Sequence, residues 1–207
     1  MKARIQAKQS FIRNTRIGFS NTHRKAAILD SGLERDYFEW KRFELPADSG
    51  FMMQPEHTEY EDINGNLQRY TPDAEYSVGL TNYKDEVKYV KNALVPMIQV
   101  KHQRLKAHYK AEDENNVFRV VTEEDIRVGH RIDNIRQLYP STLHEPPQAL
   151  FNQLVHGLKW KCLNIKALQE AASKKKLPIW LVKRCIAHKL FECDLTQHWS
   201  SIVLSWE

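Results

Sequence analysis

Cysteine is scarce in this sequence, and the few cysteines present are not spaced as a structural framework would need. Cys162, Cys185 and Cys193 are odd in number and include no Cys-x-x-Cys pair, so neither a disulfide framework nor a zinc site is indicated. Glycine and proline are scarce too, at 7 and 8 of 207 residues. Their scarcity excludes a collagen-like or low-complexity polymer.

Long apolar runs are also lacking. No run approaches the roughly 18 residues that cross a bilayer, and residues 1–25 alternate basic and apolar side chains without a signal-peptide core. We therefore expect a cytoplasmic protein with no membrane partner. Hydrophobic residues make up 42% of the chain, which is enough for a core, and a length of 207 residues favours one or two domains.

The net charge of +5 hides an uneven distribution of charged residues. Residues 1–25 hold seven basic residues and no acidic one, and residues 161–189 hold eight basic residues against the single acid Glu170. Such stretches either bind a polyanion such as DNA or form solvated surface. The candidate DNA-contacting residues within them are Arg13, Arg16, Lys174, Lys175 and Lys176.

Apolar residues recur at three- and four-residue steps over residues 31–43, which predicts a helix capped by Ser31. On this helix Glu34 falls on the apolar arc rather than on the polar side. Further along, Asn64-Gly65 predicts a hairpin with a type I′ turn. The other predicted elements are strands at 57–62, 67–78, 84–90 and 117–121, a helix at 97–109 and a helix start at 122–125. This order is typical of a compact α/β layer.

The residue composition changes after Tyr139, where several prolines predict a linker. The later residues predict helices at 149–158, 165–173 and 178–190 and a terminal strand within 200–206. Three helices and a β element fit a winged helix-turn-helix, although any small helical domain would look similar. We expect a basic arm at 1–25, an α/β domain at 26–139 and a mainly helical winged-helix-like domain at 140–207.

The candidate catalytic residues lie in the strand region, where Asp73 is followed by Glu86-x-Lys88. Strand alternation puts Glu86 and Lys88 on one face, and Glu34 can approach from the covering helix. Hard oxygen ligands in such a set suit magnesium, which activates water for phosphodiester hydrolysis. Three crowded carboxylates without a cation would repel one another. The alternative is a chance spacing of charged residues on a solvated face.

Five segments between residues 29 and 127 are similar to the motifs of a known family. They are LDSGLERDY at 29–37, QPE at 54–56, RYTPD at 69–73, EVKY at 86–89 and FRVVTEEDIR at 118–127. Together they resemble the TnsA-type endonuclease subunits of heteromeric cut-and-paste transposases. The resemblance implies a restriction-endonuclease-like core, followed by a winged-helix-like domain.

The resemblance also implies roles for individual residues. Glu34, Asp73 and Glu86 would be ligands of magnesium, for which manganese can substitute, and Lys88 would be the catalytic lysine. Family members cut the 5′ strand of double-stranded DNA at transposon ends. They work with a TnsB-type DDE transposase and a TnsC-type AAA+ ATPase regulator.

Two other functions stay open: a stand-alone restriction- or resolvase-like nuclease, and a non-catalytic DNA-binding adaptor. Activity without a partner protein would indicate the first, whereas the joint presence of Glu34, Asp73, Glu86 and Lys88 argues against the second. The nine histidines show no metal-ligand spacing, so His102 and His108 are expected to have ordinary surface or core roles.

Overall fold

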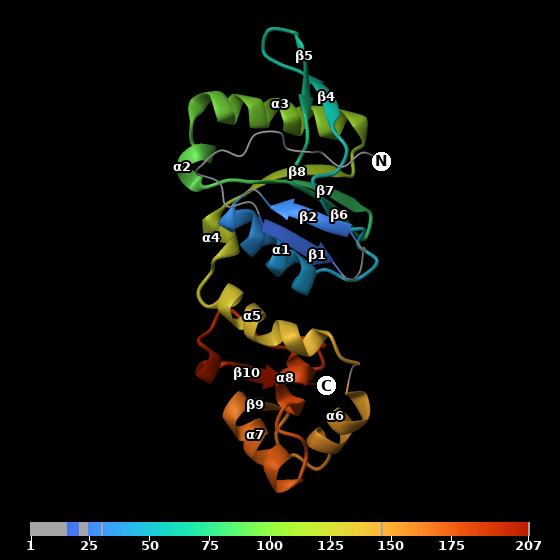
Figure 1. Cartoon of the computed structure of the whole chain (residues 1–207), viewed down its shortest axis with the longest axis vertical. Coiled ribbons are helices and arrows are strands. Elements are labelled where there is room, and N and C mark those ends of the chain that lie inside the picture. The colour runs from blue at the N-terminus through green and yellow to red at the C-terminus, as the bar shows by residue number, and fades with distance from the viewer. Residues whose placement is uncertain (1–15, 21–24, 30, 146, 207) are drawn as a thin grey trace. The chain divides into compact units, whose positions relative to one another are not determined.

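The computed structural model describes residues 16–20, 25–29, 31–145 and 147–206. These residues form two compact units, the first ending at Ile126 and the second beginning at Arg127 (Figure 1). Eight α-helices and several small sheets lie within the described residues, so the predicted α/β class is confirmed. Most of the predicted basic arm, residues 1–15, lies outside the described residues. None of the described helices is long and apolar enough to cross a membrane.

A four-stranded mixed sheet forms the centre of the first unit. Its strand order is β3 (Met52–Met53), β6 (Ala74–Val78), β7 (Thr81–Val87) and β8 (Asn116–Val121). Strand β6 runs antiparallel to β3 and β7, whereas β7 and β8 are parallel. Parallel strands need a crossover connection. Helices α2 (Val90–Ala93) and α3 (Pro96–Glu112) supply it.

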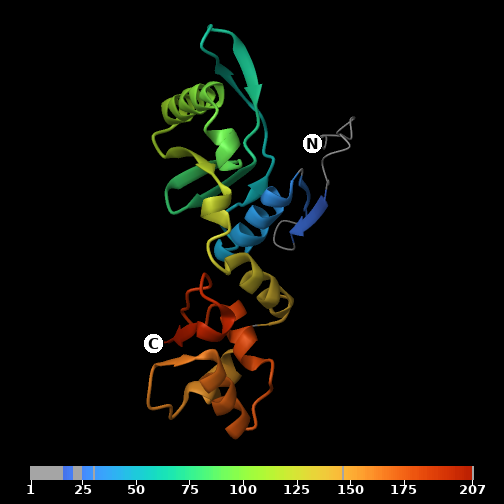
Figure 2. The ribbon, with the colours of Figure 1, turned by 90° about the vertical axis from the view of Figure 1, so that its left-hand side faces the viewer.

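Helices cover the two faces of this sheet. Helix α1 (Gly32–Glu44) lies on one face and α3 on the other, as both ribbon views show (Figures 1 and 2). The Tyr37 hydroxyl of α1 donates a hydrogen bond to Asp85 of β7, and the Tyr109 ring of α3 stacks on Phe118 of β8. The Lys84 ammonium of β7 lies 5.9 Å from the centroid of the Tyr109 ring, so the neighbouring β7 residues Lys84 and Asp85 face different helices.

Helix α1 confirms the helix predicted at 31–43. Ser31 is its N-cap residue: the Ser31 hydroxyl accepts from the Glu34 backbone N–H and donates to the Glu34 carboxylate, both at 3.1 Å. This reciprocal capping satisfies a donor that the first turn would leave unpaired. Leu33, Tyr37 and Phe38 are buried at the spacing of one helix face.

The hairpin predicted around Asn64-Gly65 is present, but its turn is not type I′. Strands β4 (Thr58–Glu61) and β5 (Leu67–Tyr70) pair antiparallel in a separate sheet. Of the two turn residues only Gly65 has a positive φ, at 78°. The Asp62 side chain accepts from the Asn64 and Asn66 backbone N–H groups at 2.8 and 3.0 Å. These two hydrogen bonds from the backbone to the Asp62 side chain stabilise the turn, so Asn64 does not need the left-handed conformation that a type I′ turn would require.

The strand predicted at 67–78 is two strands. Strand β5 ends at Tyr70 and β6 begins at Ala74. Pro72 lies between them and has no N–H to donate to a ladder, which accounts for the break. A further hairpin, β1 (Arg16–Ser20) and β2 (Lys25–Leu29), was not predicted, and β1 begins inside the predicted basic arm.

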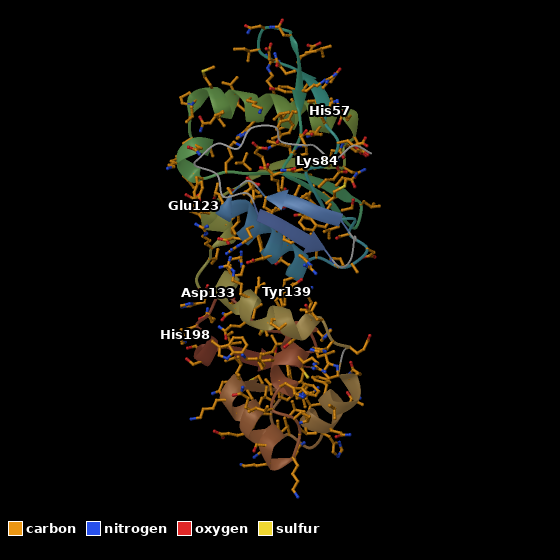
Figure 3. All side chains as sticks on the ribbon, in the orientation of Figure 1. His57, Lys84, Glu123, Asp133, Tyr139 and His198 are labelled. Carbon is orange, nitrogen blue, oxygen red and sulfur yellow. The ribbon has the colours of Figure 1, made fainter. Side chains whose placement is uncertain are left out.

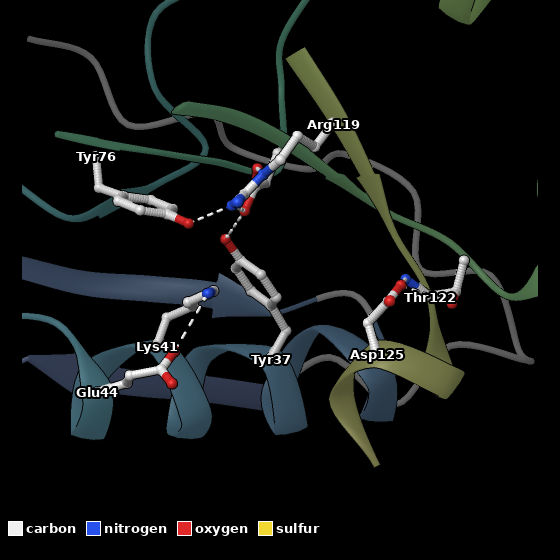
Figure 4. Close-up of polar contacts among 8 residues, drawn as sticks. Tyr37, Lys41, Glu44, Tyr76, Arg119, Thr122 and Asp125 are labelled. Atoms are coloured by element: carbon white, nitrogen blue, oxygen red, sulfur yellow. Dashed lines mark hydrogen bonds and ion pairs between the residues drawn. The ribbon is translucent and has the colours of Figure 1, made fainter. Parts of the chain in front are cut away.

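Strand β8 leads into α4 (Glu123–Ile126), which confirms the predicted helix start. The backbone N–H and the hydroxyl of Thr122 both donate to the Asp125 carboxylate at 2.8 Å (Figure 4). The carboxylate therefore satisfies Thr122 at the point where the strand becomes a helix.

The second unit contains the three helices predicted in this region and one more. It comprises α5 (Arg131–Thr142), α6 (Gln148–Val155), β9 (Cys162–Asn164), α7 (Ile165–Lys174), α8 (Leu181–Ala187), the 3₁₀ turn Trp199–Ser201 and β10 (Val203–Ser205), which pairs with β9. The β9–β10 pair includes the predicted terminal strand.

The boundary between the units lies earlier than the one expected at 139/140. Pro140, expected in a linker, lies inside α5. Asn134 of α5 donates to the backbone carbonyls of Leu195 and Gln197, both at 2.8 Å, and this helix therefore belongs with the later residues. Pro140 removes one N–H donor from α5, but the hydrogen bonds of Asn134 keep this helix with the later residues.

Candidate active site

Glu86 is the buried centre of the predicted site. Its side chain lies on β7 with 4% of the residue exposed. One carboxylate oxygen, Oε2, accepts a 2.5 Å hydrogen bond from the Tyr70 hydroxyl, and the other, Oε1, forms an ion pair with the Lys88 ammonium. The predicted placement of Glu86 and Lys88 on one face is therefore confirmed. Burial, and then the nearby Glu86 charge, raise the pKa of Tyr70, so this phenol stays protonated and donates.

Lys88 directly follows the last residue of β7. Its backbone N–H donates to the carbonyl of Val121 at 3.0 Å, which continues the pairing with β8 beyond the strand. Burial disfavours the charged ammonium, but attraction to Glu86, Asp73 and Glu34 outweighs it and raises the pKa of Lys88. This lysine is therefore a fixed positive charge among carboxylates.

The chain just beyond Lys88 is also fixed. The carboxylate of Glu123, a residue labelled in Figure 3, accepts a 2.7 Å hydrogen bond from the Val90 backbone N–H, where α2 begins. Glu123 comes from α4, so a residue distant in sequence holds the segment that carries Lys88. The sequence signal for Glu123 was its place in a predicted helix start, and its bond to Val90 was not anticipated.

Asp73 lies in the short segment before β6 rather than on a strand. Its Oδ2 atom accepts a 2.7 Å hydrogen bond from the Val87 backbone N–H, and Val87 lies between Glu86 and Lys88 in the chain. Burial away from water and repulsion by Glu86 raise the pKa of Asp73 to about 8, with a smaller contribution from Glu34. The hydrogen bond from the Val87 backbone and, less strongly, the Lys88 charge oppose this rise in the Asp73 pKa. Asp73 is thus an acid that a nearby cation would convert to its charged form.

Glu34 approaches from the first turn of α1. It is half-buried, and its charge acts on both Asp73 and Lys88. The structure therefore brings all four predicted residues, Glu34, Asp73, Glu86 and Lys88, within electrostatic range of one another.

The predicted metal ligands do not form a closed set of metal-binding oxygens. Across the described part of the chain, no group of three or more His, Cys, Asp and Glu side chains is arranged to hold an ion. Both Glu86 oxygens and one Asp73 oxygen already accept hydrogen bonds from the protein. Magnesium commonly binds through only one or two carboxylates together with water and substrate phosphates. The donor chemistry of Asp73 and Glu86 fits such an ion.

A second buried charge cluster lies on the α1 face and was missed in the sequence (Figure 4). Asp85 is fully buried and accepts from Tyr37 at 2.7 Å and from the Arg119 guanidinium at 2.8 and 2.6 Å. Arg119 also donates to the Tyr76 hydroxyl. Strand alternation could have predicted this cluster, because it puts Asp85 on the sheet face opposite Glu86. Helix α1 covers that face.

The candidate DNA-contacting lysines have different environments. Lys174, Lys175 and Lys176 are all exposed, but the Lys175 ammonium donates to the backbone carbonyls of Gln153 at 3.0 Å, Leu154 at 2.9 Å and His156. Lys175 therefore satisfies the C-terminal end of α6. Arg13 lies outside the described residues, and for Arg16, the first residue of β1, only the backbone is described.

Comparison of the chain with models of known protein families gives no match, and comparison with curated proteins gives none. The TnsA-type assignment therefore stays a prediction from the sequence motifs.

Proposed function

We propose that this chain is a magnesium-dependent DNA endonuclease. The observation that carries the proposal is the position of Asp73: its Oδ2 is held by the backbone between Glu86 and Lys88, and three other charged residues act on it. Carboxylates that repel one another beside a lysine destabilise a fold; such perturbed groups cluster at functional sites, and a bound cation would relieve their repulsion.

The side chains of the site supply distinct functions in this proposal. Asp73 and Glu86, supported by Glu34, would hold the ion. When bound, magnesium polarises a phosphoryl oxygen and makes water a better nucleophile. Lys88 remains charged, and its ammonium is placed to offset the negative charge that develops on the phosphate. Tyr70 orients Glu86 by donating to Oε2.

We further propose the biological setting that the motifs imply. The first unit would be a restriction-endonuclease-like core and the second a winged-helix-like domain. The chain would hydrolyse the 5′ strand at transposon ends in the cytoplasm. It would act with a TnsB-type DDE transposase and a TnsC-type AAA+ regulator.

The test is strand cleavage of a labelled transposon-end duplex, with magnesium or with a chelator, and with or without the transposase encoded beside this chain. Asp73→Asn should abolish magnesium-dependent cleavage of the 5′ strand. Glu114→Gln is the matched control, because Glu114 is an exposed acid between α3 and β8. Normal cleavage by Asp73→Asn would overturn the site. Full activity of the chain without a partner would replace the transposase setting by a stand-alone nuclease.

A further inference from the structure

Helix α3 turns a histidine toward the sheet face that carries Glu86. The buried residues of this helix are His102, Leu105 and Tyr109, which lie on one helical face. The His102 ring lies 5.8 Å from the Phe118 ring, centroid to centroid. Phe118 pairs with Lys84, two residues before Glu86 on β7, so these side chains share one face of the sheet.

The His102 imidazole has a polar atom with no partner. Only 9% of the residue is exposed, and Nε2 is a buried atom without a hydrogen-bond partner in the part of the chain that the structure describes. Burial lowers the pKa of His102; Glu86 opposes this shift, whereas Lys88 and Lys101 add to it. A neutral imidazole has one N–H donor and one acceptor nitrogen. An unpaired buried nitrogen destabilises the protein unless a ligand or water satisfies it.

Lys101 directly precedes His102 on α3, and the positive charges of Lys88 and Lys101 both act on the His102 imidazole. The Lys101 ammonium is 4.8 Å from the centroid of the Tyr70 ring, and Tyr70 in turn donates to Glu86. The negative charge of Glu86 is already balanced by Lys88. Lys101 and Lys88 thus place hydrogen-bond donors next to the acidic cluster, and His102 adds a third donor in the tautomer that carries its proton on Nε2.

We propose that Lys101 and His102 form a phosphate-binding subsite beside the acidic cluster. Its ligand is a backbone phosphate of the DNA strand being cut, which the His102 imidazole and the Lys101 ammonium bind by hydrogen bonds. The identification of this phosphate as DNA rests on the proposed function, whereas the capacity to bind phosphate rests on these residues alone. The spacing between His102 and the other histidines matches no metal-ligand motif, so the sequence predicted only an ordinary surface or core role for His102.

The first test uses inorganic phosphate as the probe and the full chain labelled with ¹⁵N-histidine. The His102 imidazole resonances, assigned with His102→Gln, should shift saturably as phosphate is added. Lys101→Met should weaken this binding roughly tenfold, because it removes a charge-assisted hydrogen bond. Lys106→Met is the matched control, since Lys106 is exposed on the same helix, and it should bind as the parent does. An unshifted His102, or equal effects of both lysine variants, would overturn the subsite.

The second test measures binding of a fluorescein-labelled DNA duplex without magnesium at several salt concentrations. Lys101→Met should flatten the slope of log affinity against log salt by about 0.9, the value for one neutralised phosphate. His102→Gln should weaken binding without changing the slope, because the donor that it removes is neutral. If His102 responds to phosphate but the parent binds no DNA, the proposed function fails and the subsite stands. If the parent binds DNA and both variants bind it as tightly as the parent does, the subsite fails and the function stands.

Discussion

The Tyr37 hydroxyl lies 2.7 Å from Oδ2 of Asp85, and this hydrogen bond joins the helix that carries Glu34 to the strand that carries Glu86. Tyr37 follows Glu34 by about one helical turn, and Asp85 directly precedes Glu86. Tyr37 and Asp85 both have 0% exposure. Because the pair is fully buried and hydrogen-bonded, it fixes the spacing between Glu34 and Glu86, two acids that lie on different elements.

Tyr37→Phe should lower the free energy of unfolding by about 1–2 kcal/mol, because it removes one buried hydrogen bond to a charged group. Arg119→Met should lower it more, by about 3 kcal/mol, since it leaves Asp85 buried without its countercharge. Urea denaturation followed by tryptophan fluorescence measures both values. Equal stabilities of Tyr37→Phe and the parent would mean that the pair does not join these elements.

Asp73→Asn should stabilise the protein in alkaline solution without metal. The pKa of Asp73 is raised to about 8, so the folded state favours the protonated acid. The stability from this protonation is complete below the unfolded-state pKa of about 4 and is lost as the pH rises through 8. The asparagine stays neutral at every pH.

Thermal melts in a chelator at pH 4.5 and pH 9 measure this effect. The melting temperature of Asp73→Asn should exceed that of the parent by at least about 2 °C at pH 9, and the difference should shrink at pH 4.5. Magnesium should reduce the difference at pH 9, because it stabilises only the carboxylate form in the parent. A difference independent of pH would show that Asp73 is an ordinary ionised carboxylate.

Replacement of the three consecutive lysines should separate structure from binding. Lys175→Met should destabilise the second unit by about 1 kcal/mol, because it removes the donor to three carbonyls at the end of α6. A combined Lys174→Met and Lys176→Met variant should keep the parent stability and weaken DNA binding. The salt slope should flatten by about 0.9 for each phosphate that the variant no longer neutralises. An unchanged slope would assign these two lysines to solvated surface.

Local signals predicted the elements that carry the site. Ser31 and the apolar period located α1, the helix predicted at 97–109 located α3, and the Glu86-x-Lys88 spacing gave the shared face on β7. Each of these signals lies within one turn or one strand, so it depends little on tertiary context.

Interactions between residues that are distant in the sequence could not be predicted from such local signals. The bond from the Val87 backbone to Asp73 and the ion pair of Arg119 with Asp85 join residues on different elements, and no local pattern marks them. Pro140 indicated a linker, yet the packing of α5 in the second unit overrides that preference. The sequence did not show that the Lys175 ammonium is bound, because its carbonyl partners are about twenty residues away, on α6 and directly after it.

Lys88 and Glu34 have different proposed roles in the site, and measuring metal affinity together with cleavage separates these roles. Lys88→Ala should bind magnesium or manganese at least as tightly as the parent, because a competing cation is removed from Glu86, and yet cut about a hundred- to ten-thousand-fold more slowly. Glu34→Ala should reduce metal affinity and cleavage together.

The measurement is calorimetric manganese titration of the parent and both variants, beside single-turnover cleavage with the partner transposase present. Manganese binding should survive in Lys88→Ala while cleavage does not, and both should fall in Glu34→Ala. A Lys88→Ala protein that cuts at the parent rate, or a parent chain that binds no manganese, would contradict the assignment of these residues to a metal-dependent nuclease site.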